Sequence, residues 1–185
     1  TADIIFNQNV SNNKFQNASC QLIAKIVPKV VSGGTPVSGS VSIKTWVKAS
    51  ASSYQNIGYA RRIYEITPAT NPATSSGTVT LYYSQADFAN FNQEDNGLDL
   101  PTGPTDNANK ANLRISKLNG SSTDNSGNPN TYPGPGSVIN PDDANIVWNS
   151  TLNLWEVTFD VAGFSGFFLQ TSTILLPVKL ISFTA

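Results

Sequence analysis

The chain has 185 residues, of which 12% are charged and 39% are hydrophobic, and its formal net charge is -1. Its lysines and arginines are dispersed, which argues against the basic stripe of a nucleic-acid-binding protein. No run approaches the roughly 20 apolar residues that cross a bilayer, so we expect no membrane insertion.

The chain contains no histidine and one cysteine, Cys20. The missing imidazole removes the usual general base and the commonest metal ligand, and we therefore predict that the chain is not an enzyme and requires no cofactor. A single cysteine cannot form an internal disulfide. Because Leu22 and Ala24 follow it, we expect the Cys20 thiol to be a small buried core group. The length favours one domain, 1–185.

The first two strands are predicted from their alternation of apolar and polar residues. Residues 20–27 form the first, which ends before Pro28. The second covers 41–48, where odd positions are mostly apolar and even positions carry serine, two lysines and Trp46. This period of two places Trp46 on the polar face of its strand.

Two further strands and one helix follow. In strand 61–67, Arg62 shares a face with tyrosine and isoleucine, and we expect it either to pair with a carboxylate inside the domain or to face a ligand. Strand 78–83 also alternates. A short helix is predicted near 84–92, because Ser84 and Asp87 have capping-box spacing and two phenylalanines follow at three-residue spacing.

Two long stretches, 93–111 and 119–145, are rich in Asn, Asp, Gly and Pro, and the strand 113–118 separates them. Loops of this length are uncommon in a compact domain and are often functional. Past the second loop, 146–148 and 155–161 read as a β-hairpin that places Trp155 in the core.

Strand 167–169 follows a bend that contains two glycines, and 175–183 reads as a last strand and exit tail. About eight or nine short strands with turn signals predict an all-β fold. We expect an antiparallel β-sandwich, Ig-like or jelly-roll, with one short helix; a barrel is the alternative.

Acidic residues gather in the two long loops. Such residues among Asn and Gly commonly form solvated turns, and nothing in their pattern indicates the paired carboxylates of a glycoside hydrolase. The same oxygens could instead hold calcium, which binds carboxylates and amides on flexible loops, although the ordered EF-hand spacing is absent. The candidate calcium ligands are Asp95, Asp99, Asp106, Asp142 and Asp143, with Glu94 and Asp124 nearby.

Aromatic residues on polar faces or in loops are candidates for stacking on sugar rings. Trp46 fits this description best, and burial against a second sheet or another domain is the alternative for it. The weaker candidates are Tyr54, Tyr59, Tyr82 and Tyr132.

Two segments carry a resemblance to a known family. The first consists of LWEVTFDVAGFSGFFLQT at 154–171 and LPVKLISFTA at 176–185; the second consists of RRIYEITPATN at 61–71 and VTLYYSQADF at 79–88. They resemble the region that precedes the C-terminal sorting domain in type IX secretion cargo proteins of Bacteroidetes. The resemblance implies a secreted or cell-surface location, an upstream domain, and 176–185 as the exit segment toward a sorting domain. No ligand or catalytic residue comes with it.

The sequence therefore favours a secreted, non-catalytic carbohydrate-binding module of a larger multidomain protein, which binds polysaccharide by aromatic stacking and loop hydrogen bonds. The alternative is an adhesin-like structural spacer with no ligand site of its own. A binding module predicts exposed coplanar aromatic rings beside polar loops, whereas a spacer predicts that Trp46 is buried.

Overall fold

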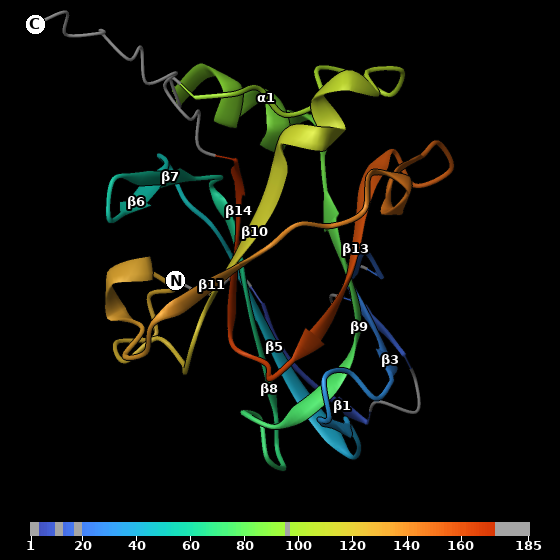
Figure 1. Cartoon of the computed structure of the whole chain (residues 1–185), viewed down its shortest axis with the longest axis vertical. Helices are drawn as coiled ribbons and strands as arrows, with labels where there is room; N and C mark the ends of the chain where they lie inside the picture. Colours follow the sequence, from blue (N-terminus) through green and yellow to red (C-terminus); the bar gives the residue numbers. More distant parts are fainter. Residues whose placement is uncertain (1–3, 10–12, 17–19, 95–96, 173–185) are drawn as a thin grey trace, which may run out of the picture.

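The computed structural model describes residues 4–9, 13–16, 20–94 and 97–172. Two mostly antiparallel sheets pack against each other, and their inner faces share one hydrophobic core (Figure 1). This confirms the predicted all-β sandwich with one short α-helix. The last predicted strand, 175–183, and the exit segment, 176–185, lie outside the described residues.

The first sheet has six strands, in the order β1 (Ile4–Asn9), β5 (Ser40–Val47), β8 (Arg62–Pro68), β14 (Gly166–Thr171), β10 (Leu113–Leu118) and β11 (Gly136–Ile139). The second sheet has the order β12 (Ile146–Asn149), β13 (Leu154–Ala162), β9 (Ser75–Tyr83), β3 (Leu22–Pro28) and β2 (Lys14–Gln16), and β4 (Thr35–Pro36) pairs in parallel with β9. A separate hairpin consists of β6 (Ser52–Tyr54) and β7 (Ile57–Tyr59). Three short 3-10 helices lie in the connections, η1 (Ala108–Asn112), η2 (Pro129–Thr131) and η3 (Asp143–Asn145).

Every predicted strand that lies within the described residues is present, and β10 has the predicted bounds, 113–118. The strands that were not predicted are β1, β2, β4, β6, β7 and β11. Most of these have only two to four residues, too short for a period of two to stand out.

The helix α1 (Gln85–Glu94) closes one end of the sandwich (Figure 1). Its predicted capping box is present, because Asp87 N donates to Ser84 Oγ at 3.1 Å and Ser84 N donates to Asp87 Oδ2 at 2.7 Å. Phe88 and Phe91 are buried, and the Phe88 ring stacks on Trp155 with centroids 5.4 Å apart. The predicted core position of Trp155 is thereby confirmed. Within the described part of the chain, no helix has the length and apolar character needed to cross a membrane.

Candidate functional site

Four of the five aromatic residues predicted to bind a ligand come together on the outer face of the first sheet. Trp46 lies beside Ile63 on the neighbouring strand, and the rings of Tyr59 and Tyr132 lie 5.2 and 5.3 Å from Phe168. Tyr54 packs against the edge of this group and is half-buried. We call the buried members the outer core: Trp46, Tyr59, Ile63, Leu118, Tyr132 and Phe168.

The outer core is covered. Trp46 is 0% exposed, Tyr59 1% and Tyr132 6%. Residues 119–135, which we call the strap, lie over this face together with the β6–β7 hairpin (Figure 1). Of the two outcomes expected for Trp46, burial is the one observed, and the ring is not available for stacking on a ligand: the residue lies on the outward face of β5, as its register predicted, and the strap rather than a second sheet or another domain covers it.

Two glycines allow this close cover. Gly127 in the strap has φ +70°, and a Cβ built there would lie 2.6 Å from the Trp46 ring. Gly166 lies under Tyr132, where a Cβ would meet that ring at 2.5 Å. Both contacts need a residue without a side chain, because real Cβ atoms do not approach neighbours this closely.

Glu65 anchors the strap to the sheet. Its carboxylate is buried on the outer face of β8, where Oε2 accepts hydrogen bonds from Ser122 N at 2.7 Å and from the Tyr132 hydroxyl at 2.9 Å. Lys44 Nζ lies 3.1 Å from Oε1 and also donates to Asn125 in the strap. Burial and the neighbouring carboxylate raise the pKa of Tyr132. Glu65 was not among the predicted site residues, although a charge in the middle of a strand is a signal for a buried polar contact.

The calcium hypothesis stays a prediction. Asp95 lies outside the described residues, and Asp99, Asp142 and Asp143 are exposed. Asp106 already caps its own loop, since its carboxylate accepts bonds from Thr102 N at 3.0 Å and from Asn109 Nδ2 at 2.9 Å. These bonds lower the pKa of Asp106 to about 2, and the bond from Thr102 N has the largest effect. No three acidic or cysteine side chains within 4–9, 13–16, 20–94 and 97–172 are placed to hold one metal ion.

The outer face of the second sheet carries a depression of about 370 Å³, and a second of about 510 Å³ adjoins it at the end of the sandwich, where Arg62 and Tyr64 of β8 also line it. They share Leu22, Tyr82 and Leu152, so they form one surface, which we call the open groove. Tyr82, the fifth predicted aromatic, lies at this junction and is 6% exposed. Burial and the nearby Glu156 raise the pKa of Tyr82 to about 12, which keeps its hydroxyl protonated as a donor.

Polar side chains cross the open groove in register. Lys25, Thr80 and Thr158 are cross-strand partners on β3, β9 and β13, and the two threonine hydroxyls are 2.8 Å apart. Glu156 pairs with Tyr82 in the next row and accepts a hydrogen bond from Asn149 Nδ2 at 2.8 Å. Since these side chains are outward on neighbouring strands, the sheet itself holds their spacing.

Arg62 lines one end of the open groove. Its Nε donates to Asp87 Oδ2 at 2.8 Å, which confirms the expected pairing with an internal carboxylate. The hydroxyl of the adjacent Tyr64 donates to the carbonyl of Tyr82, linking the two sheets at this end.

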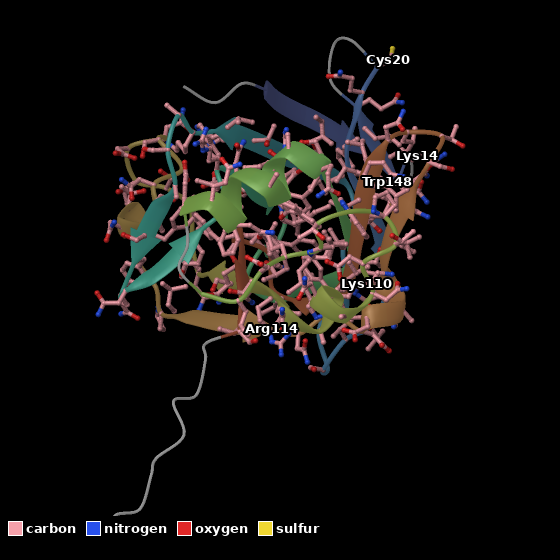
Figure 2. All side chains as sticks on the ribbon, turned by 90° about the horizontal axis from the view of Figure 1, so that it is seen from above. Lys14, Cys20, Lys110, Arg114 and Trp148 are labelled. Carbon is pink, nitrogen blue, oxygen red and sulfur yellow. The ribbon has the colours of Figure 1, made fainter. Side chains whose placement is uncertain are left out.

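Cys20 corrects another expectation. Its thiol is exposed rather than buried, and it projects from the edge of the molecule beside the open groove (Figure 2). The strand begins at Leu22, two residues later than the sequence indicated, and Cys20 has φ 60°. This left-handed conformation breaks the alternation that would have directed the side chain inward.

Comparison with known proteins finds no matching family model, no similar curated protein and no similar solved structure.

Proposed function

We propose that this chain is a secreted, non-catalytic binding module that holds polysaccharide in the open groove. The observation that carries the proposal is the difference between the two outer faces: one is covered by the strap, and the other presents a groove lined with hydrogen-bonding side chains. Binding modules on β-sandwiches need such an accessible surface with a few placed polar groups.

The groove offers donors and acceptors suited to sugar hydroxyls. Thr158 and Asn149 are half-buried and offer a hydroxyl and an amide that both donate and accept, while Thr80 and Tyr82, each 6% exposed, lie beside them. Leu22 and Leu152 supply apolar surface at the junction of the depressions. In this proposal, hydrogen bonds from the sheet replace the aromatic stacking expected from the sequence.

The proposed location rests on the sequence. The resemblance to type IX cargo proteins supports secretion or cell-surface display, with the module joined to an upstream domain and followed by a sorting domain. The chain then contributes retention on a polysaccharide while another domain of the same protein acts.

A structural spacer is the second candidate, and one observation favours it. Trp46, Tyr59 and Tyr132 are all core residues, and a spacer needs its aromatic side chains inside. The sandwich with an anchored strap then serves to hold an upstream domain away from the cell.

Affinity electrophoresis across a panel of neutral and acidic polysaccharides separates these candidates. The wild-type chain is compared with Thr158→Phe, which fills the groove, and with Val138→Phe on β11, whose parent side chain is 58% exposed on the other sheet. We expect retention of the wild type and of Val138→Phe, and its loss in Thr158→Phe. Equal retention of both variants would mean that the binding site lies outside the open groove. No retention on any polysaccharide would favour the structural spacer over the binding module.

We propose calcium only as a stabilising ion bound by acidic residues of the two long loops. A ligand that binds the native state alone raises the transition temperature, so a thermal melt with and without chelator tests it. The calcium site is supported if chelator lowers the transition temperature of the wild type and has no such effect on Asp142→Asn or Asp143→Asn. An unchanged melt counts against it.

A further inference from the structure

We infer that the polysaccharide held in the open groove is acidic, with carboxylate groups such as those of uronic acid residues. This inference rests on the proposed function and adds the chemical class of the ligand. Its basis is the charge of the side chains that line the groove, which differs from the charge of the chain as a whole.

The lining of the open groove carries an excess of positive charge. Lys14, Lys25 and Arg62 line it together with the carboxylate of Glu156, and because Arg62 is paired with Asp87, the lining keeps an excess of one positive charge. The whole chain has a net charge of -1, with 11 basic and 12 acidic residues. A local cationic groove on a slightly acidic protein attracts anionic ligands.

The cations are placed along the groove rather than in one cluster. Lys25 stands in the middle row beside Thr80 and Thr158, while Arg62 lies at the end near Tyr82. Arg62 keeps 24% of its side chain exposed, and a guanidinium has more N–H donors than its bond to Asp87 uses. A carboxylate on a bound chain can therefore accept hydrogen bonds at that end.

Glu156 is a negative charge within the lining and opposes the binding of an anionic ligand. It is half-buried in the row next to Lys25, and it already raises the pKa of Tyr82. A carboxylate-bearing ligand bound across Tyr82 is repelled by this side chain. Removing the charge of Glu156 should therefore strengthen binding, which is the opposite of what removing Lys25 should do.

A hydroxyl-rich chain fits this lining better than the other anionic polymers. Nucleic acids are bound by many basic contacts to phosphate, and this groove has three basic residues among threonine, asparagine and tyrosine side chains. An acidic peptide is attracted by the same charge, and a test with polyglutamate separates it from a polysaccharide.

The test compares polygalacturonate with its methyl ester, which has the same backbone without the negative charges. Retention of the 185-residue chain is measured by affinity electrophoresis at pH 8 for wild type, Lys25→Gln and Glu156→Gln. Arg114→Gln is the matched control: it also removes one positive charge, from β10 of the first sheet, far from Lys14 and Cys20, which line the open groove (Figure 2). Mobility is expressed relative to gels without polysaccharide, so that charge changes in the protein cancel.

We expect Lys25→Gln to weaken binding to polygalacturonate by about two- to fivefold and Glu156→Gln to strengthen it by a similar factor. Arg114→Gln should match the wild type, and neither groove variant should alter retention on the methyl ester. Added salt should reduce binding to the charged polymer.

The inference fails if the methyl ester is retained as well as polygalacturonate, or if Lys25→Gln behaves like Arg114→Gln. Tighter retention on polyglutamate would assign an acidic peptide and overturn it as well. Retention on neutral polysaccharides alone would overturn only this inference, whereas no retention on any polysaccharide would also remove the proposed function.

Discussion

The outer faces of the two sheets have similar sequence patterns, but in the folded chain one face is covered and the other is accessible as a groove. On β5 the even positions carry Lys44 and Trp46, and on β9 they carry Thr80 and Tyr82. Both sets point away from the shared core, as their alternation predicts. The strap covers the first set and makes it a second core, while the second set lines a groove. Alternation therefore identifies a face, but not whether another segment covers it.

The difference arises from what each face offers to a covering segment. The first face presents Ile63 and Phe168, and full burial of each side chain stabilises the fold by roughly 1.5–3 kcal/mol. It also presents Glu65, whose carboxylate binds a backbone N–H and a tyrosine hydroxyl of the strap. The second presents threonines and lysine, whose desolvation without partners would oppose any similar cover.

The largest effect that separates the two faces is expected from Trp46→Ala. Removing a fully buried indole leaves a cavity under the strap, and the free energy of unfolding should fall by about 3–5 kcal/mol. Val138→Ala, at a 58% exposed position, should change it by less than about 0.5 kcal/mol. Urea denaturation measures both. A loss below about 1 kcal/mol for Trp46→Ala would mean that the ring is not packed as described.

Glu65 and Glu156, one on each outer face, offer a matched pair. Glu65→Gln removes the charge that holds Lys44 and two strap groups, and it should cost about 2–4 kcal/mol of unfolding free energy. Glu156→Gln lies on the open face and should cost less than about 1 kcal/mol. The same denaturation experiment compares them. Equal costs would contradict the view that only the first face is an anchored interior.

The glycine contacts of the strap should show a smaller effect. Gly127 and Gly39 both have positive φ, but only Gly127 lies against another side chain, since a Cβ at Gly39 meets nothing within 4 Å. Gly39→Ala should cost about 1–2 kcal/mol from backbone strain alone. Gly127→Ala adds the clash with Trp46 and should cost about 1–3 kcal/mol more. Thermal melts of the two variants test this, and equal costs would show that the strap does not press on the ring.

The smallest effect concerns pH. The pKa of Asp106 is lowered from 3.8 to about 2 in the folded chain by hydrogen bonds from the Thr102 backbone N–H first, and then from Asn109 and the Thr102 hydroxyl. The bonds therefore add stability above pH 3.8 that is lost as the pH falls toward 2. Because Asp106 is only half-buried, solvent screens these bonds and the contribution should stay below about 1 kcal/mol. Urea denaturation from pH 5 to pH 2 should show a smaller acid-induced loss in Asp106→Asn; an identical loss would contradict this assignment.

Local chemistry could be predicted from the sequence. The capping box of Ser84 and Asp87, the hairpin of β12 and β13, and the bounds of β10 depend on neighbouring residues. The pairing of Arg62 was anticipated as one of two outcomes, and its partner, Asp87, comes from the helix cap.

The covered face could not be predicted, because it depends on contacts between distant segments. Gly127 meets Trp46 across 81 positions, and Glu65 binds Ser122 across 57. Neither contact leaves a periodic trace in the sequence, so the sequence left both an exposed and a buried Trp46 open and did not indicate the strap as its cover. The error at Cys20 has a different origin, since a single residue with positive φ ended the alternation.

The most direct test of the account is a titration of the ¹⁵N-labelled chain with oligogalacturonate, followed by backbone amide chemical shifts. We predict the largest changes on the open face of β3, β9 and β13, around Lys25, Thr80 and Thr158, and little change in the strap. Changes centred on the strap and the β6–β7 hairpin, or none at any amide, would contradict the claim that the uncovered sheet is the binding surface.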